Sequence, residues 1–275
     1  MSATTQPVFI VGTGRCGTRA LYKMLAGTPG VEAHHEHLCT HVQQVAALYA
    51  MGEVSNEVAR YQLVQFYGSV QLSDAAIWID ASNKASWVML LLRDLFPAAK
   101  FVVLYRDGRK VVPSFLHKLG AECYDDKSVA VMRAWRTGDS AVMPPPEKRY
   151  WWNVPISGPW ANEFRSFDQL QRICYHWTPC NAEIMRQLGK LPPEAYFEMK
   201  LEDLVSDPAR VKALAEFIGI EPKPEHFESL RTPQNALFPM NFRLTEEQLV
   251  KFNAICGPMM QRLGYADAEA YDVHY

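Results

Sequence analysis

The clearest structural motif of this 275-residue chain is Val8-Phe9-Ile10-Val11-Gly12-Thr13-Gly14-Arg15-Cys16-Gly17-Thr18-Arg19. Its first four residues are apolar, and most are β-branched or aromatic, which predicts a short buried strand. Glycines then open the backbone, and a helical pattern begins near Thr18. Backbone N–H groups and the positive end of the helix dipole face such a turn. The sequence therefore predicts an anion-binding loop.

This loop lacks two parts of the usual ATP-binding loop. Gly12 and Gly17 have the spacing of the glycines in the P-loop pattern GxxxxGK[ST]. Thr18 stands where that pattern has lysine, and Arg19 stands where it has the serine or threonine that holds magnesium. The cation of this loop is Arg15, inside the turn. We therefore expect a phosphate site that needs no magnesium–nucleotide complex.

The composition limits the classes of protein to which the chain can belong. Apolar residues make up 48% of the chain, and 28 basic residues oppose 30 acidic ones. A net charge of −2 predicts no general affinity for nucleic acid or for a membrane surface. Six cysteines without a CxxC pair favour free thiols over a zinc site. Because no long apolar run or signal sequence is present, we expect a cytoplasmic protein. The sequence makes no prediction of its oligomeric state.

Strands and helices alternate after the loop. Residues 100–105 form an apolar run without alternation, as is typical of a parallel strand covered on both faces. Other strands are expected at 76–80 and 195–199, and residues 31–38 read as an extended segment. Helices are expected at about 20–25, 40–68 with a break near Gly52, 87–95, 110–118, 167–188, 209–217 and 245–263. This order predicts an α/β fold with a parallel sheet, whose ligands bind beyond the carboxyl ends of the strands.

The segment at about 120–165 has a weaker pattern. It contains a basic and aromatic cluster, Lys148-Arg149-Tyr150-Trp151-Trp152, between runs rich in proline. A long irregular segment in a compact domain is usually functional or disordered, and its aromatic residues argue against disorder. We expect a lid or substrate wall inserted in a single domain that spans 1–275. The alternative is a peripheral subdomain with its own small core.

A second candidate phosphate site follows the strand at 100–105. Arg106 stands at the end of this strand, where a guanidinium can bind a phosphate through two parallel hydrogen bonds. Ser114 lies eight residues further on, about two helical turns away. The alternatives are an ion pair of Arg106 with Asp107 or Glu202, and a surface role for Ser114. Together with the loop, the pair indicates a ligand with two separated phosphate-like groups.

Three segments together resemble motifs of the PAPS-dependent sulfotransferases. Gly12–Thr18 is similar to their 5′-phosphosulfate loop, GxxRSGT, and Arg106–Ser114 is similar to their 3′-phosphate motif, RDxRDxxxS. Leu201–Pro208 is similar to the YEDLxxxP segment of the family. The motifs occur in the family's order, so the resemblance covers residues from about 7 to 265. It implies a P-loop-like parallel sheet flanked by helices, 3′-phosphoadenosine 5′-phosphosulfate (PAPS) as donor, and no required metal.

The resemblance also implies roles for individual residues. The implied donor-binding residues are Thr13, Gly14, Arg15, Cys16, Gly17, Thr18, Arg19, Arg106 and Ser114. Arg15 and the loop amides would stabilise the departing 5′-phosphate, whereas Arg106 and Ser114 would hold the 3′-phosphate. Arg15 stands where cytosolic members have lysine, which favours the bacterial and tyrosylprotein-like branches. Cys16 replaces a serine and Leu201 replaces a tyrosine of the family patterns. Lys84 and Arg243 are further cations that resemble ligand-binding residues of some relatives.

A general base is also required, because the acceptor loses a proton. In tyrosylprotein-like members a glutamate follows the loop at about the interval from Arg15 to Glu36, which makes Glu36 the implied base. Cytosolic members use a histidine instead, so the neighbouring His35 and His37 remain alternates. A metal site at these histidines has no spaced third ligand nearby. The remaining alternative is a polar strand end without a catalytic role.

The expected function is transfer of a sulfuryl group from PAPS to a hydroxyl or an amine or amide nitrogen of a small molecule, with release of adenosine 3′,5′-bisphosphate (PAP). The aromatic stretch 150–160 and Trp135 predict a pocket for a planar or cationic acceptor, and tailoring of a natural product is the favoured role. The rivals are a tyrosylprotein sulfotransferase, a P-loop kinase that uses ATP, and a silent nucleotide-binding protein.

Overall fold

The computed structural model describes residues 5–119, 123–150, 153–156, 160–231 and 244–265. Its described part contains one five-stranded sheet in the order β2-β3-β1-β4-β5. The strands are β1 (Gln6–Val11), β2 (Val31–His35), β3 (Ile77–Ala81), β4 (Lys100–Tyr105) and β5 (Tyr196–Lys200). All neighbouring strands are parallel. The predicted α/β fold with a P-loop-like parallel sheet flanked by helices is confirmed.

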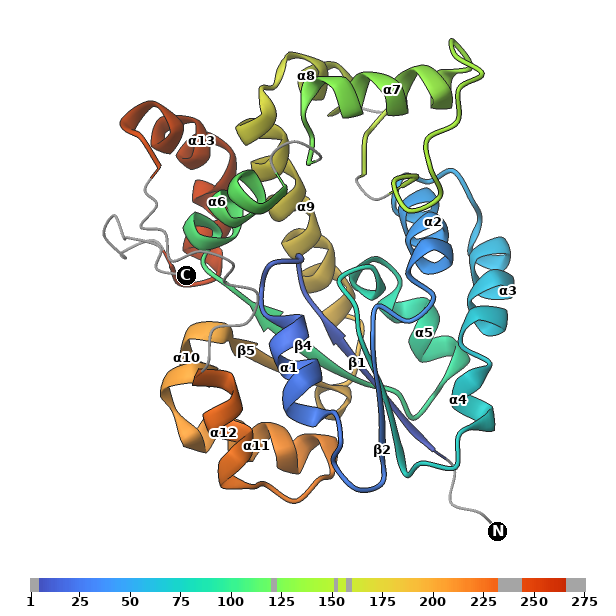
Figure 1. The fold of residues 1–275 in the computed structure, drawn as a ribbon, viewed down its shortest axis with the longest axis vertical. Coiled ribbons are helices and arrows are strands. Elements are labelled where there is room, and N and C mark those ends of the chain that lie inside the picture. Colours follow the sequence, from blue (N-terminus) through green and yellow to red (C-terminus); the bar gives the residue numbers. More distant parts are fainter. Residues whose placement is uncertain (1–4, 120–122, 151–152, 157–159, 232–243, 266–275) are drawn as a thin grey trace.

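Helices cover both faces of the sheet (Figure 1). One layer contains α1 (Thr18–Leu25), α10 (Leu201–Ser206), α11 (Pro208–Ile218) and α12 (Pro224–Arg231). The other layer contains α2 (Cys39–Ala50), α3 (Asn56–Phe66), α4 (Ser69–Leu72), α5 (Met89–Leu95), α6 (Gly108–Leu119), α9 (Gln169–Leu188) and α13 (Glu246–Arg262). Two short helices, α7 (Asp126–Thr137) and α8 (Trp160–Ser166), lie beyond the carboxyl ends of the strands. Short 3₁₀ turns, η1 (Ala85–Trp87) and η2 (Pro193–Ala195), precede α5 and β5.

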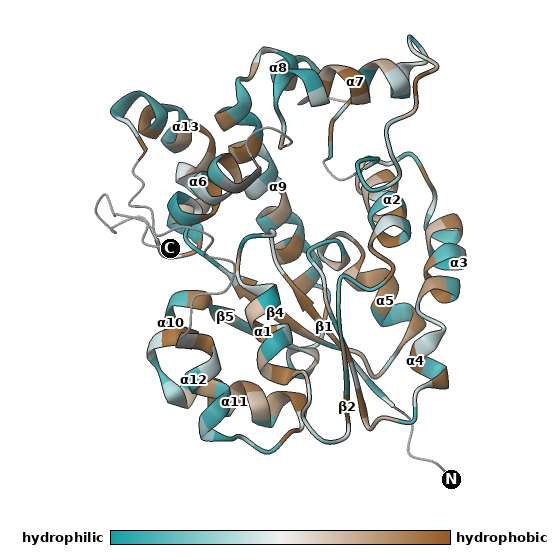
Figure 2. Ribbon diagram, in the orientation of Figure 1, coloured by the Kyte–Doolittle hydropathy of each residue, from teal (hydrophilic) through white to brown (hydrophobic). Residues whose placement is uncertain are grey.

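The alternation of side chains along β1 divides the core in two. Phe9 and Val11 pack in one cluster with residues of α2, α3, α5, α9 and α13. Val8 and Ile10 pack in the other cluster with residues of α1, α11 and α12. All four side chains are fully buried, because helices cover both faces of a parallel sheet. In Figure 2 the hydrophobic sides of α5, α9 and α11 are turned towards the sheet.

Two parts of the chain are more regular than the sequence predicts. Residues 31–35, expected only to be extended, form the edge strand β2, which pairs with β3. The segment expected to be irregular contains α7, whose first turn is capped by the Asp125 side chain accepting from the Ser128 N–H. Val129 and Met132 of α7 are buried in the larger core cluster. The irregular assignment is therefore wrong for α7, because its N-cap and its buried positions favour a helix.

The helices also bear on membrane insertion. In the described ranges, none combines the length and the hydropathy that a membrane-crossing helix needs.

Candidate active site

The carboxyl ends of the parallel strands bring the sequence motifs to one edge of the sheet. The loop 12–17 follows β1. Glu36 follows β2, directly after His35, which pairs with Ala81 of β3. The turn 82–84 follows β3, Arg106 follows β4, and Leu201 follows β5. The structure therefore places the motif residues where ligands bind in open α/β sheets.

The loop 12–17 is held in a conformation that needs glycine at Gly12, Gly14 and Gly17. Gly14 has a φ of 80°, and a Cβ there would lie 2.9 Å from the Asn83 amide nitrogen. A Cβ on Gly12 would lie 2.4 Å from the Cys16 sulfur. Arg15 itself has a φ of 54°, which is uncommon for a residue with a side chain. Successive N–H groups of such a backbone form a concave nest that binds anions.

The side chains of the loop divide into exposed and buried groups. Cys16 is fully buried beneath the loop, and burial raises the pKa of its thiol. Its side chain is therefore a packing group, and only its backbone can contact a bound anion. Thr13 and Thr18 are also buried, and the Thr13 hydroxyl donates to the Gly14 carbonyl at 3.1 Å. Arg19 is exposed in the first turn of α1.

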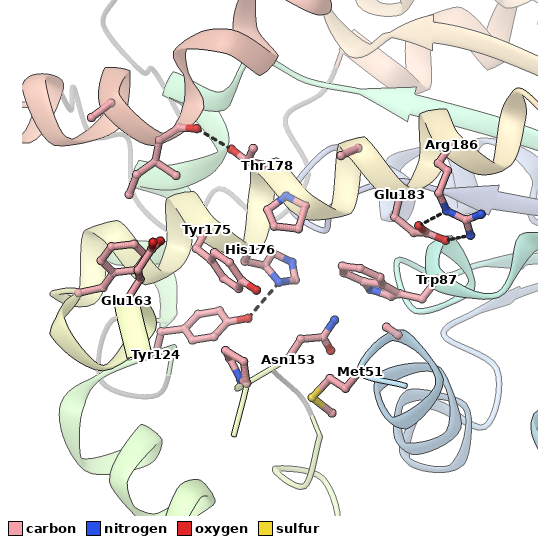
Figure 3. Close-up of a pocket in the computed structure, with 17 residues that line it drawn as sticks. Met51, Trp87, Tyr124, Asn153, Glu163, Tyr175, His176, Thr178, Glu183 and Arg186 are labelled. Atoms are coloured by element: carbon pink, nitrogen blue, oxygen red, sulfur yellow. Dashed lines mark hydrogen bonds and ion pairs between the residues drawn. The ribbon is translucent and has the colours of Figure 1, made fainter. Parts of the chain in front are cut away.

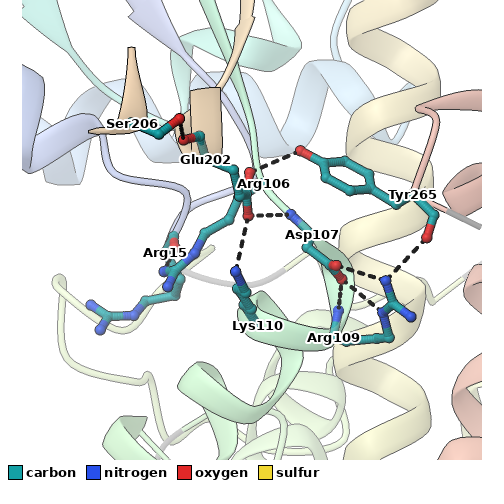
Figure 4. A network of polar contacts seen from close by, with 8 residues as sticks. All are labelled: Arg15, Arg106, Asp107, Arg109, Lys110, Glu202, Ser206 and Tyr265. Carbon is teal, nitrogen blue, oxygen red and sulfur yellow. Dashed lines mark hydrogen bonds and ion pairs between the residues drawn. The ribbon is translucent and has the colours of Figure 1, made fainter. Parts of the chain in front are cut away.

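The two predicted phosphate sites meet at Arg15. Its Nε–H donates to the Ser114 Oγ at 2.9 Å, and Arg106 Nη1 donates to the Arg15 carbonyl at 2.7 Å. Ser114 is 1% exposed, so the surface role considered for it is wrong. The ion pair considered for Arg106 is absent from the described residues: Asp107 pairs with Arg109 at 2.8 Å, and Lys110 lies 3.9 Å from Glu202. Figure 4 shows Arg15 and Arg106 beside this separate network.

The network in Figure 4 fixes the turn after β4. Asp107 accepts from both the backbone N–H and the guanidinium of Arg109, which also donates to the Tyr265 carbonyl at 3.0 Å. The Tyr265 hydroxyl donates to Glu202 at 3.1 Å, and burial raises the pKa of this tyrosine. The third motif therefore supports the second through Glu202. Leu201 packs against the loop, where a Cβ on Gly17 would lie 2.9 Å from its Cδ1.

The candidate base Glu36 lies in a strained turn after β2. Glu36 and Leu38 have φ values of 57° and 45°. The Glu36 N–H donates to the Ala81 carbonyl at 3.2 Å, and the Cys39 thiol lies 3.7 Å from Glu36 Oε2. Non-glycine residues whose backbone is held in the left-handed region cluster at active sites, where the surrounding structure imposes this conformation.

The two alternate bases face other parts of the protein. The His37 ring nitrogen Nε2 lies 3.1 Å from the Phe66 carbonyl, and its ring packs against Trp78 with centroids 5.1 Å apart. The His35 ring packs against Tyr22 of α1 at 5.7 Å. Burial lowers the pKa of both histidines. These contacts favour Glu36 over either neighbour as the group that receives a proton.

Lys84 is a buried cation within the site. It is 5% exposed, and burial lowers the pKa of its ammonium, whereas the nearby Cys39 and Glu36 raise it. Its charge also acts on His176 of α9. The weak sequence signal at Lys84 therefore marks a residue that lies between Glu36 and the helix α9.

His176 is a site residue that the sequence analysis missed. Its Nε2 lies 3.0 Å from the Thr13 carbonyl, and its Nδ1 lies 3.1 Å from the Tyr124 hydroxyl. A carbonyl only accepts, so Nε2 carries the proton and Nδ1 accepts from Tyr124. Burial, together with the charge of Lys84, lowers the pKa of His176 to about 4. A single histidine in an amphipathic helix gives no sequence signal of this contact.

A cavity of about 650 Å³ borders His176 (Figure 3). Its aromatic lining comes from Trp87, Tyr124, Phe167 and Tyr175. The sequence predicted a pocket built by Trp135 and the stretch 150–160. Asn153 and Pro155 of this stretch do line the cavity, but Trp135 does not line it and packs against Tyr150 at 5.5 Å.

The remaining sequence predictions concern a metal site and residues outside the described part of the chain. Within the described ranges, no cluster of three or more His, Cys, Asp or Glu side chains is arranged to hold a metal. Arg243 and the residues 151–152 and 157–159 lie outside the described part of the chain.

The sheet order and the loop after β1 define a P-loop-like α/β fold, and comparison with known proteins gives the family of the chain. Residues 7–143 match the model of the sulfotransferase family. The fold is similar to the sulfotransferase domain of the curacin biosynthetic pathway, with 16% identity, a TM-score of 0.52 and coverage of 96% of this chain and 99% of that one. It is also similar to a sulfotransferase from Mycobacterium avium, with 12% identity, a TM-score of 0.52 and coverage of 94% and 77%. The search of curated proteins gave no match. The chain belongs to the sulfotransferase family and is a transferase.

Proposed function

We propose that the enzyme transfers the sulfuryl group of PAPS to a hydroxyl or an amine or amide nitrogen of a small molecule and releases PAP. The observation that carries this proposal is the convergence of Arg15, Arg106 and Ser114 at one sheet edge. Two phosphate-like groups on one nucleotide need two cationic sites at fixed separation. ATP has no 3′-phosphate for the second site, and Thr18 and Arg19 replace the residues that a kinase needs for magnesium and phosphate.

In this proposal the donor is held by the loop and the strand end. The loop amides and Arg15 bind the 5′-phosphosulfate, and Arg106 with Ser114 binds the 3′-phosphate. Charge builds on the departing 5′-phosphate when the S–O bond breaks, so positive groups that are already in place lower the barrier. Arg15 and the buried Lys84 supply such groups next to the loop. No metal is required for this role.

The cavity of about 650 Å³ beside His176 is lined by neither Glu36 nor Arg15. The acceptor in this proposal therefore places only its non-reacting part in this cavity. Its oxygen or nitrogen attacks the sulfur in line with the departing 5′-phosphate, and Glu36 takes the proton that this atom loses. The cavity size fits a small molecule, and its aromatic lining suits a planar group. The name of the similar curacin-pathway domain supports natural-product tailoring as the role.

Calorimetry without metal tests the donor assignment. PAP is titrated into the wild-type protein and into Arg106→Ala, and ADP is titrated as a comparison. We expect PAP to bind more tightly than ADP, and we expect Arg106→Ala to remove most of this preference, by about 10- to 100-fold. Equal binding of both nucleotides, or binding only with magnesium, would contradict the proposal and favour the kinase alternative.

A further inference from the structure

The turn that carries Glu36 is held by a hydrogen bond to Asp80, a buried residue of the neighbouring strand β3. Glu36 and Leu38 both have left-handed φ values, 57° and 45°, and neither is glycine. Residues other than glycine seldom adopt this backbone conformation unless neighbouring groups impose it. The His37 N–H, between the two strained residues, donates to Asp80 Oδ1 at 3.0 Å. Asp80 thus contacts the backbone at the centre of this turn.

The second oxygen of Asp80 is also occupied. The Tyr67 hydroxyl donates to Asp80 Oδ2 at 3.0 Å, and both side chains are fully buried. Tyr67 follows α3 and packs edge-on against Trp78 of β3, with ring centroids 5.9 Å apart. One oxygen of Asp80 therefore holds the turn, and the other anchors the carboxyl group to a rigid aromatic core.

Packing alone does not account for an acid at this position. Asp80 is a β3 residue paired with Phe9 of β1, and the neighbouring core is made of Phe9, Tyr67 and Trp78. Burial of a carboxyl group destabilises the fold unless hydrogen bonds within the protein replace those that the group made with water. An apolar side chain would fill the space, but it would leave the His37 N–H without its acceptor.

The charges near Asp80 fit a positioning role. The ionisable groups whose charges act within this cluster are Glu36, Cys39, Tyr67 and Lys84, and His37 contacts the carboxyl group through its backbone N–H. Glu36 and Asp80 repel when both are ionised. Asp80 therefore holds Glu36 through the backbone of the turn and not through side-chain attraction.

We propose that Asp80, anchored by Tyr67, is the positioning residue that fixes the Glu36 turn for proton transfer. This inference rests on the proposed function, because it assigns Glu36 as the base. Asp80 does not touch the reacting atoms. It acts on Glu36 through the His37 N–H, so its removal should loosen the turn without affecting the donor site around Arg15 and Ser114.

The first test is hydrogen exchange of the wild type and Asp80→Asn, followed by mass spectrometry. Asn keeps the shape of Asp but has a single acceptor oxygen, so it cannot accept from both the His37 N–H and the Tyr67 hydroxyl. We expect amide exchange in a peptide covering 35–39 to rise at least tenfold. Exchange in the loop 12–17 and the PAP dissociation constant should stay within twofold. Unchanged exchange at 35–39 would overturn the proposal.

The second test is a double-mutant cycle on PAP release from PAPS in water, measured over hours with enzyme in excess, so that no acceptor is needed. If Asp80 acts through Glu36, Asp80→Asn should lower the rate about 10- to 100-fold in the wild type and by less than twofold in Glu36→Gln. Equal losses in both backgrounds would show a merely structural role and overturn the proposal. If Glu36→Gln itself keeps the wild-type rate, the base assignment fails, and the proposal fails with it.

If Asp80→Asn does not fold, Tyr67→Phe provides a second test of the proposal by hydrogen exchange. It removes only the anchoring hydroxyl and leaves the His37–Asp80 bond in place. We expect a smaller rise in exchange at 35–39, of about threefold, with PAP affinity unchanged. No rise in this variant, in a protein that folds, would contradict the anchoring role of Tyr67.

Discussion

The Nε of Arg15 lies 2.9 Å from the Oγ of Ser114, although the two residues are 99 positions apart in the sequence. Arg15 belongs to the loop after β1, and Ser114 belongs to the second turn of α6. The pairing of β1 with β4 makes this contact possible, because it brings the two strand ends side by side. One hydrogen bond thus joins the two motifs that the sequence shows only separately.

Ser114→Ala tests the importance of this contact for the donor. The change removes the oxygen that orients the Arg15 guanidinium, and it also removes a hydroxyl from the proposed 3′-phosphate site. A hydrogen bond to a charged group contributes about 1.5–3 kcal/mol, so we expect PAP to bind roughly 10- to 100-fold more weakly in calorimetry. Ser166→Ala is the control, since Ser166 is exposed on α8 and donates only to the Glu163 carbonyl. Equal affinities of the two variants would remove Ser114 from the donor site.

Gly14→Ala tests whether the loop shape is needed. A Cβ at this position has an unfavourable φ of 80° and would lie 2.9 Å from the Asn83 amide nitrogen, so the loop must move. We expect the melting temperature to fall and PAP affinity to drop by at least about tenfold, because left-handed strain costs about 1–2 kcal/mol and the nest is displaced. The measurements are thermal unfolding and PAP titration.

Gly27→Ala is the matched control for this substitution. Gly27 has a similar φ of 84°, but a Cβ there meets nothing within 4 Å. The control should therefore lose a similar amount of stability from backbone strain and keep wild-type PAP affinity. A loss of PAP affinity in the control would mean that general destabilisation, and not the loop geometry, explains the result for Gly14.

Glu36→Gln tests the assigned base. Glutamine keeps the size and the polar contacts of the side chain but cannot accept the proton of the acceptor. We expect the rate of PAP release from PAPS to fall about 10²- to 10⁴-fold, whereas PAP binding stays unchanged. His35→Gln and His37→Gln are the comparison, and each should keep the rate within a few fold. A large loss in either histidine variant, with Glu36→Gln active, would move the assignment to that histidine.

The parts of the site that lie within one segment were predictable from the sequence. The spacing of its glycines predicts the loop Gly12–Thr18. An apolar run followed by arginine predicts the strand end at Arg106. The role of Asp80 was not predictable, because an acid at a strand end looks like an ordinary turn residue. Its contacts with His37 and Tyr67 depend on how β2 and β3 pair.

Long-range packing also explains why His176 was missed. The α9 helix was predicted at 167–188 and is formed by Gln169–Leu188. Which of its residues faces the loop depends on the rotation of α9 against η1 and α6, and a single sequence does not contain this information. The same limit applies to the cavity, since its aromatic lining is drawn from η1 and α9 and from the segments that precede α7 and α9.

The pH dependence of stability should reveal two buried groups that act in opposite directions. The pKa of His176 is lowered to about 4, so its contribution is complete above the unfolded pKa of about 6.5 and is lost as the pH falls towards 4. Burial raises the pKa of Asp80 to about 7, so its contribution is present below about pH 3.9 and is lost as the pH rises through 7. Between pH 7 and 5 each amounts to about 2 kcal/mol, with opposite signs.

Urea unfolding at pH 7 and pH 5 measures this balance. For the wild type, we expect the two contributions to cancel nearly, because lowering the pH strengthens the one and weakens the other. Asp80→Asn removes the Asp80 contribution, so the free energy of unfolding should fall by about 2 kcal/mol more than in the wild type between pH 7 and 5. In His176→Gln the free energy of unfolding should fall by about 2 kcal/mol less than in the wild type over the same pH range, since the His176 contribution is absent. Parallel changes in all three proteins would show that neither group titrates within this range in the folded state.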